Sequence, residues 1–268
     1  MTSVGEACRV YENEALREAG DGLIRPGGLE LTRRAIAISG LALGSRVLDI
    51  GCGTGVTLSY LIESGGFRAV GIDLSMLLLA EGQGRNPGLP LARASGTHLP
   101  FADAAMDAIL AECSLSVMED VDKVLAECLR VLKPDGVLLV HDVYARNPHA
   151  GASLKGLPLR CCLTGAVSRE EWIARLEGCG FGVTVWEDHT IALKEFAARL
   201  IFSCGSLQAF WCRSPGGAGT EDAREIQHAV SAAKPGYFLL MAEKRHGWTR
   251  MDTDGHGWTR IVDFIRGL

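Results

Sequence analysis

The residues best placed to do chemistry form a glycine-rich turn behind an acid. Asp49 lies in the apolar run 46–50, which leads directly into Gly51-Cys52-Gly53-Thr54-Gly55 and then a helical pattern. Glycine lacks the Cβ atom that would keep a ligand away from backbone N–H groups. Asp73 closes the next apolar run, where a carboxylate can accept hydrogen bonds from ribose hydroxyls. The pattern predicts a ligand with a ribose at Asp73 and an ammonium group near Asp49.

Two other interpretations of the turn stay open. The glycines can serve only to pack a helix against a strand, although the order of acid, glycines, helix, strand and acid favours a ligand site. An NAD-dependent oxidoreductase is disfavoured, because Val56 interrupts the GxGxxG spacing of the dinucleotide-binding fingerprint.

The composition excludes several classes of protein. The chain has 268 residues with a net charge of -5, which argues against a nucleic-acid-binding protein that uses a broad basic face. It lacks an apolar run long enough to cross a bilayer and the pattern of a secretory leader. Nine cysteines without a CxxC pair favour a reducing compartment over disulfides or structural zinc. We expect a cytoplasmic monomer or homodimer that binds neither nucleic acid nor membrane.

Short apolar runs alternate with amphipathic stretches, which predicts an α/β fold with a mostly parallel sheet. The expected strands are Arg46–Ile50, Ala69–Asp73, Leu91–Ala94, Met106–Ala111, Gly136–Asp142, Phe181–Glu187 and Tyr237–Lys244. The expected helices are Val10–Ala19, Leu29–Ile38, Gly55–Glu63, Ser75–Gly82, Val121–Leu132, Ser168–Cys179, Ile191–Cys212 and Glu221–Ala233.

We divide the chain into three parts. Residues 1–43 are expected to form an N-terminal helical cap, and residues 44–245 the main domain. An insertion at about 145–233 adds to the cap, and its first part, 145–167, is expected to have little regular structure. Residues 246–268 form a tail in which the segment 246–250 recurs as 256–260.

Four segments resemble, in order, the motifs of class I S-adenosylmethionine-dependent methyltransferases, especially the type 11 subgroup that acts on small molecules. The segments are Val47–Gly55, Val70–Ser75, Leu99-Pro100-Phe101 with Asp103 and Asp107, and Leu129–Gly136. The resemblance implies a Rossmann-like three-layer sandwich, in which a seven-stranded, mostly parallel sheet has an antiparallel last strand, plus the helical cap. It also implies S-adenosylmethionine as the cofactor and a small-molecule acceptor.

The resemblance further implies which residues contact the cofactor. They are Asp49, Gly51, Cys52, Gly53, Gly55, Asp73, Leu74, Ser95, Gly96 and Glu112. Asp73 matches the position that binds ribose, and Leu74 the position that packs on adenine. The family often has an Asp that accepts from the adenine amino group, where this chain has Ala94-Ser95-Gly96. Ser95 or a backbone carbonyl must take that place.

The acceptor side has less distinctive candidates. Because the methyl group of a sulfonium is already activated, the protein mainly aligns the reactants and excludes water, and no universal catalytic residue is expected. Asp142, Tyr144, Cys162 and His189 follow strands or lie in the insertion, so each is a candidate. An ordinary structural role is at least as well supported for each of them.

The segment Cys162–Ala166 resembles the Cys-x-x-Gly-Ala element of arsenite methyltransferases, whose cysteine binds the metalloid as a thiolate. Cys162 and Cys204 are therefore candidate metalloid ligands, since thiolates bind soft acceptors. The alternative is that these cysteines are small buried hydrophobes, and no metal site is expected. Metalloid methylation is one alternative function, and non-catalytic binding of the cofactor or its demethylated product is another.

Overall fold

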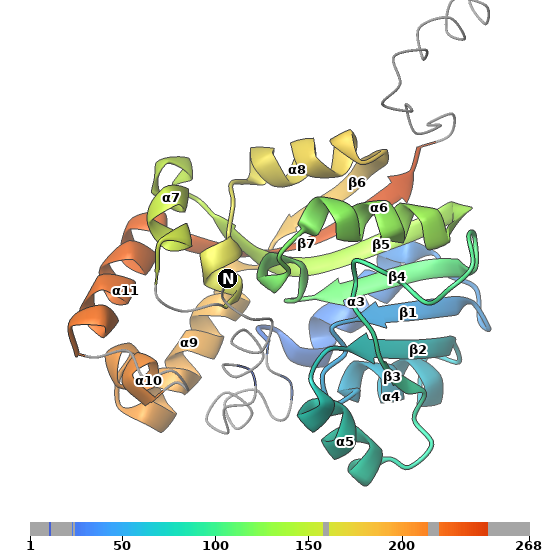
Figure 1. The fold of residues 1–268 in the computed structure, drawn as a ribbon, viewed down its shortest axis with the longest axis horizontal. Helices are drawn as coiled ribbons and strands as arrows, with labels where there is room; N and C mark the ends of the chain where they lie inside the picture. Colours follow the sequence, from blue (N-terminus) through green and yellow to red (C-terminus); the bar gives the residue numbers. More distant parts are fainter. Residues whose placement is uncertain (1–10, 12–22, 24, 158–160, 214–219, 246–268) are drawn as a thin grey trace, which may run out of the picture.

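A seven-stranded sheet forms the centre of the structure, a computed structural model that describes residues 11, 23, 25–157, 161–213 and 220–245 (Figure 1). Its strand order is β3-β2-β1-β4-β5-β7-β6. The strands are β1 (Arg46–Ile50), β2 (Arg68–Asp73), β3 (Leu91–Arg93), β4 (Met106–Glu112), β5 (Leu132–Ala145), β6 (Phe181–Asp188) and β7 (Pro235–Lys244). The predicted helix Val10–Ala19, apart from Tyr11, and the repeated tail lie outside the described residues.

The pairing of the strands confirms the predicted sheet. Strands β1 to β5 pair in parallel, whereas β7 is antiparallel to both β5 and β6. Strand β5 is longer than predicted at both ends, because it pairs with β7 from Val137 to Ala145 and with β4 at Leu132. The parallel pairs place the carboxyl ends of β1, β2 and β4 side by side, and ligands bind at this edge in open α/β sheets.

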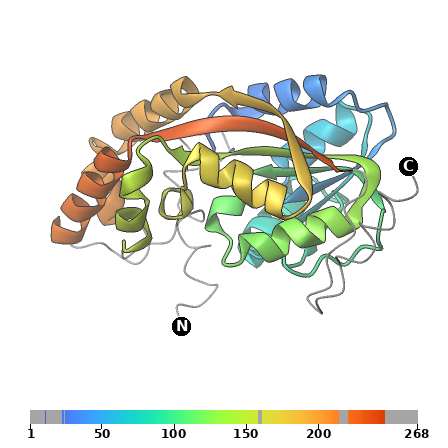
Figure 2. The same cartoon turned by 90° about the horizontal axis from the view of Figure 1, so that it is seen from above.

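Helices cover both faces of the sheet, which makes the three layers seen in Figure 2. Helices α3 (Gly28–Ser39) and α4 (Val56–Glu63) pack on one face. Helices α6 (Val121–Val131) and α8 (Arg169–Gly178) pack on the other, and α5 (Met76–Arg85) lies beside β2 and β3. Helix α6 buries an apolar stripe at helical spacing, Val121, Val124, Leu125 and Cys128. Asp120 and Ser168 cap α6 and α8 by accepting hydrogen bonds from backbone N–H groups.

A second group of helices lies beyond the ends of β5 and β7 and shares its own apolar core. It contains α7 (Gly151–Lys155), α9 (Thr190–Cys204), α10 (Leu207–Arg213), α11 (Thr220–Ala233) and the 3-10 turns η2 (Pro148–Ala150) and η3 (Cys162–Gly165). Leu154, Phe196, Phe210 and Ile226 are buried in this core. We call these elements the helical cap.

Two expectations about the cap were wrong. The single helix predicted over Ile191–Cys212 is divided into α9 and α10, because Gly205 has a φ of 86° and ends α9. Ser206 then accepts a hydrogen bond from Ala209 N and starts α10. The segment 145–167, expected to have little regular structure, contains η2, α7 and η3.

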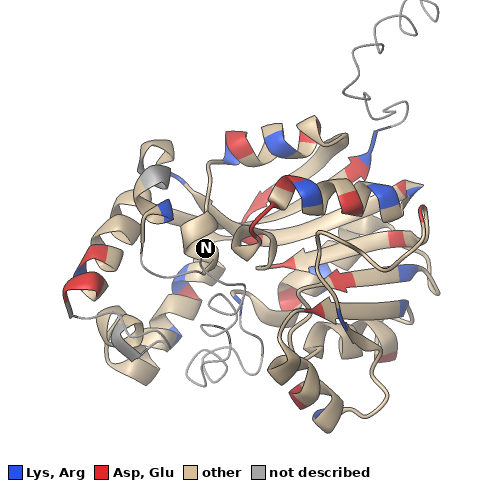
Figure 3. Ribbon diagram, viewed as in Figure 1, with Lys and Arg blue, Asp and Glu red and all other residues tan. Residues whose placement is uncertain are grey.

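Acidic and basic residues are interspersed along the outer helices, as the colours of α6 and α8 show in Figure 3. Arg175, for example, lies 3.1 Å from Glu171 on α8. Within the described ranges, no helix is long and apolar enough to cross a membrane.

Gly165 lies at a close contact between the cap turn η3 and the segment that follows β4, and it provides a test of the fold. A Cβ atom built on it would lie 1.7 Å from the carbonyl oxygen of Ser116 in η1 (Leu115–Val117). We expect Gly165→Ala to lower the free energy of unfolding by about 1–3 kcal/mol in urea denaturation.

Gly178→Ala is the matched control, because Gly178 lies in α8 with no atom within 4 Å of the added Cβ. This change should be neutral or stabilise by up to about 1 kcal/mol. Equal effects of the two substitutions would contradict the close packing of η3 against η1.

Candidate cofactor and acceptor site

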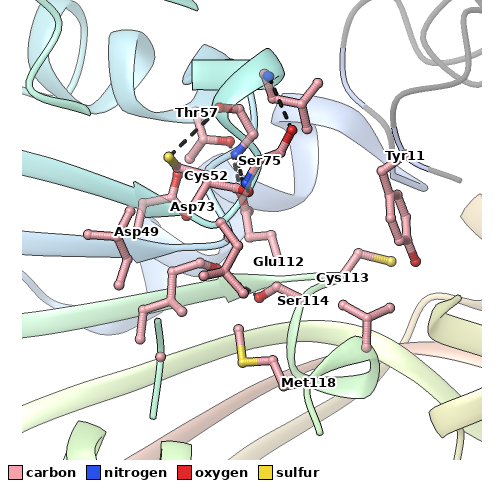
Figure 4. Close-up of a pocket in the computed structure, with 18 of the residues that line it drawn as sticks. Tyr11, Asp49, Cys52, Thr57, Asp73, Ser75, Glu112, Cys113, Ser114 and Met118 are labelled. Atoms are coloured by element: carbon pink, nitrogen blue, oxygen red, sulfur yellow. Dashed lines mark hydrogen bonds between the residues drawn. The ribbon is translucent and has the colours of Figure 1, made fainter. Parts of the chain in front are cut away.

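A cavity of about 340 Å³ lies at the carboxyl ends of β1, β2 and β4. We call it the central cavity. Figure 4 shows residues from each of these strand ends around it, with Tyr11 approaching from the opposite side. Its position is that of ligand sites in open α/β sheets.

The glycine turn forms one wall of the central cavity. Gly51 and Gly53 have positive φ angles of 76° and 55°, which only glycine adopts without strain. A Cβ atom on Gly51 would lie 2.5 Å from Cβ of Ser114, so the turn also requires glycine for close packing. Cys52 lies between them and also lines the cavity. The turn therefore forms a cradle that a ligand can approach closely.

Asp73 holds the turn against the end of β2. Its two carboxylate oxygens accept hydrogen bonds from Gly53 N at 2.9 Å and Ser75 N at 2.8 Å. Each oxygen keeps a further lone pair, so the carboxylate, which lines the cavity, can still accept from ribose hydroxyls. The assignment of ribose to Asp73 stays a prediction that this geometry permits.

Gly55 differs from the other glycines of the turn. It is not among the residues that line the central cavity. A Cβ atom on it would lie 2.5 Å from Leu89 Cδ2, and its φ of 78° starts α4. The structure therefore shows a packing role for Gly55, and its contact with the cofactor stays a prediction.

The side of the cavity assigned to adenine contains the residues predicted there. Leu74, Ser95 and Gly96 all line it. Ser95 Oγ lies 2.9 Å from Thr97 Oγ1, so a hydroxyl pair occupies the place of the carboxylate that the family often has. A Cβ on Gly96 would lie 3.3 Å from side-chain atoms of Met118, which also lines the cavity.

Glu112 is the centre of a buried polar network at the end of β4. Its carboxylate lies 2.8 Å from Arg25 Nη2 and accepts hydrogen bonds from Thr32 and Thr57. His141 Nδ1 lies 3.0 Å from Glu112 Oε1 and donates to it. Burial opposes the charge, but Arg25 and the hydrogen bonds outweigh it and lower the pKa of Glu112 to about 2.

Asp49 lies beside this network, but its pKa is shifted upward, in the opposite direction to that of Glu112. It is 2% exposed and lines the cavity. Burial and the neighbouring charge of Glu112 raise its pKa well above the usual range. A cationic group brought into the cavity would stabilise the ionised carboxylate, which fits the ammonium and sulfonium groups expected there.

The far end of the cavity combines residues from distant parts of the chain. Tyr11 and Cys113 both line it, and Tyr11 Oη accepts a hydrogen bond of 2.8 Å from the backbone N–H of Cys162. Cys113 has a φ of 56°, a conformation that is uncommon outside glycine and often found at functional sites. Burial raises the pKa of Tyr11. A side-chain hydrogen bond with Cys162, together with burial, raises the pKa of Cys113, so this end is uncharged.

Three acceptor-side candidates do not reach the central cavity. Asp142 is completely buried and accepts hydrogen bonds from the backbone N–H and the hydroxyl of Ser116. Tyr144 donates to Asp188, and His189 Nε2 lies 3.1 Å from Glu187. None of the three is among the lining residues. Sequence placed them correctly near strand ends, but packing turns their side chains elsewhere.

The cysteine candidates are explained by packing. Gly165 and Ala166 of the Cys-x-x-Gly-Ala element pack η3 against η1 and the cap core. Cys204 is buried in the cap, and burial raises the pKa of Cys161 to about 12. In the part of the chain that the structure describes, no group of three or more potential ligands could hold a metal ion. The structure does not support a metalloid site at Cys162 and Cys204.

Sequence analysis missed Arg25, Thr57 and Tyr11. Arg25 was not a candidate, because its burial, which requires an acidic partner, is visible only in the structure. Thr57 stands in the first turn after the glycines, where it could have been considered. No local pattern indicates that Tyr11 approaches the strand ends.

The low pKa of Glu112 predicts a pH dependence of stability. Because its pKa is about 2 when folded and about 4.5 when unfolded, its contribution is complete above about pH 4.5 and is lost as the pH falls towards 2. The difference in unfolding free energy between wild type and Glu112→Gln should shrink over that interval in urea titrations. Glu225→Gln, at an exposed position of α11, is the control and should show no such trend. A difference that stays constant with pH would contradict the assigned ionisation.

Residues 48–140 match the family described as a methyltransferase domain. A demethylmenaquinone methyltransferase from Renibacterium salmoninarum is 38% identical over 108 residues, which is 40% of this chain and 45% of the relative. The chain spans about half the length of the curated relatives it matches. The segment that matches the family, residues 48–140, contains the glycine turn, Asp73 and Glu112.

Solved structures share the fold over most of the chain. The [4+2]-cyclase SpnF has a TM-score of 0.67 at 25% identity. The superposition covers 87% of this chain and 92% of the SpnF chain. A Haemonchus contortus phosphoethanolamine N-methyltransferase 2, in complex with S-adenosyl-L-methionine, has a TM-score of 0.66 at 18% identity. It covers 87% of this chain and 56% of its own, and at this identity it supports the fold alone. With its sheet order, glycine turn and family match, the chain contains a class I S-adenosylmethionine-dependent methyltransferase domain.

Proposed function

We propose that this protein transfers the methyl group of S-adenosylmethionine to a small-molecule acceptor. The observation that carries the proposal is the central cavity, which extends from the glycine turn to Tyr11 and Cys113. The end at the turn offers a glycine cradle and carboxylates, which suit a ribose and a cationic methionine group. The other end is left for an acceptor.

The chain's own residues would supply alignment and a dry, negatively charged surrounding. Bound S-adenosylmethionine offers a methyl carbon on a sulfonium, and an acceptor lone pair attacks that carbon in line as the carbon–sulfur bond breaks. Asp49 and Glu112 favour the cationic ground state electrostatically, and Ile50 and Ile72 exclude water from the same end. Binding and orientation would therefore provide most of the rate enhancement.

The lining of the acceptor end favours a largely apolar, uncharged molecule. Leu23 and Val117 line the cavity together with the neutral side chains of Tyr11 and Cys113. Relatives named for demethylmenaquinone and for phosphoethanolamine support a small-molecule acceptor in general. The apolar lining agrees better with the first of these.

Methyl transfer is tested most directly without assuming an acceptor. The protein is incubated with methyl-labelled S-adenosylmethionine and fractionated metabolite extracts, with arsenite as a separate arm, and labelled products are identified by mass spectrometry. We expect a labelled organic product from the apolar fractions.

Label on arsenite that disappears in Cys162→Ser would favour metalloid chemistry instead. Cofactor binding without any methylated product would overturn the proposal and favour a binding protein or another reaction, such as that of the cyclase with the same fold.

The ribose assignment predicts a specific loss of affinity. Asp73→Asn should raise the dissociation constant for S-adenosylmethionine about 10- to 100-fold in calorimetry. The reason is that the protein loses the charged carboxylate that accepts hydrogen bonds from the ribose hydroxyls. Asp135→Asn, at an exposed position near the start of β5 and outside the cavity, is the matched control and should bind normally. Unchanged affinity in Asp73→Asn would show that the ribose lies elsewhere.

A further inference from the structure

Two hydroxyl groups follow β3 at one end of the central cavity. Ser95 Oγ and Thr97 Oγ1 lie 2.9 Å apart, either oxygen can be the donor, and both residues line the cavity. We call them the hydroxyl pair. Ser95 Oγ also accepts a hydrogen bond of 3.3 Å from the backbone N–H of Thr97. This backbone bond holds the serine oxygen in place and leaves the direction of the bond between the two hydroxyls open.

The order of the strands places the hydroxyl pair where the base of a nucleoside would lie. The sheet order β3-β2-β1-β4 puts the end of β2 between the glycine turn, which follows β1, and the segment that follows β3. A ligand with its methionine group at the turn and its ribose at Asp73 therefore directs its base towards Ser95 and Thr97.

The lining beside the hydroxyl pair is largely apolar. A Cβ atom on Gly96 would lie 3.3 Å from Met118 Sδ and from both γ carbons of Val124, and all three residues line the cavity. Leu74 lines it as well. The lining also includes Glu119, which is exposed. The apolar side chains suit the faces of a purine, and the hydroxyl pair suits its polar edge.

The hydroxyl pair can present either an acceptor or a donor to that edge, because a hydroxyl has one hydrogen and two lone pairs. When Ser95 donates to Thr97, the serine oxygen keeps one lone pair beside its backbone bond and can accept from an amino group. When Thr97 donates to Ser95, both lone pairs of the serine are used, and its hydrogen can be donated to a carbonyl oxygen. Both arrangements keep the bond between the hydroxyls.

An ionised carboxylate at position 95 would have no such freedom, because it can only accept hydrogen bonds. It would bind the amino group that adenine has at position 6 and repel the carbonyl oxygen that hypoxanthine has there. A serine at this position removes that restriction on the base.

We propose that the hydroxyl pair admits both 6-aminopurine and 6-oxopurine forms of the cofactor, so that inosine-based ligands bind as well as adenosine-based ones. The proposal rests on the proposed function for the identity of the cofactor. It deepens that function by adding a second class of ligand for the same site and by naming Ser95 as the residue that sets the selectivity.

The test compares two ligands that differ only in the base. Dissociation constants for S-adenosylhomocysteine and S-inosylhomocysteine are measured by calorimetry in wild type and in Ser95→Asp. Wild type should bind the two ligands within about threefold of each other, because each forms one hydrogen bond with Ser95. Ser95→Asp should prefer the adenosine-based ligand about 10- to 100-fold, because its carboxylate repels the carbonyl oxygen.

Two further variants separate selectivity from general effects. Ser203→Asp, at an exposed position of α9 outside the cavity, adds the same charge and should keep the wild-type ratio. Ser95→Ala removes the hydroxyl and should weaken both ligands by a similar factor of about 3 to 10. Binding of S-adenosylhomocysteine by Ser95→Asp shows that this variant is folded.

The outcomes distinguish this proposal from the proposed function. A wild-type preference of about tenfold or more for the adenosine-based ligand would overturn the proposal, since a fixed group such as the carboxylate of Glu119 would then select the base. That result would leave the proposed function intact. Equal binding in wild type without any preference in Ser95→Asp would overturn the role of Ser95. Failure of wild type to bind either ligand would overturn both proposals.

Discussion

The ion pair between Arg25 and Glu112 joins more of this structure than any other polar contact we describe. Both side chains are 5% exposed, and burying either charge alone would be costly. Through Thr32, Thr57 and His141, the pair connects the end of β4 with α3, α4 and β5. The wall of the central cavity is therefore held by an ion pair and hydrogen bonds that form without a ligand.

Asp49 shows that the arrangement of the cavity costs the protein stability when no ligand is bound. A buried carboxylate with a raised pKa, next to another acid, destabilises the protein without a ligand. The same arrangement favours a ligand with two positive charges, because both carboxylates are already in position when it arrives. Asp49 and Glu112 are therefore complementary. One is held ionised by Arg25, and the other is stabilised in that form when a cation enters.

The acceptor end depends on contacts between segments far apart in the chain. Gly165 allows η3 to pack closely against η1. In η3, the backbone N–H of Cys162 donates a hydrogen bond to Tyr11 Oη. Cys113 faces the same space from a strained backbone conformation. The proposed acceptor end is lined by Tyr11 from the N-terminal segment and by Cys113 and Val117, which follow β4.

The sequence by itself determined the sheet and the glycine turn, because both are encoded locally. Apolar runs mark the strands, and the positive φ angles of Gly51 and Gly53 need the residue that stands there. It could not determine where side chains near the other strand ends point. Asp142 was a candidate because it follows a strand, but its side chain turns to Ser116. Arg25 and Tyr11 reach the cavity only through tertiary packing, since their partners Glu112 and Cys162 are distant in the chain. The cofactor could thus be inferred from spacing, whereas the surroundings of its charges and of the acceptor were decided by contacts that no local pattern encodes.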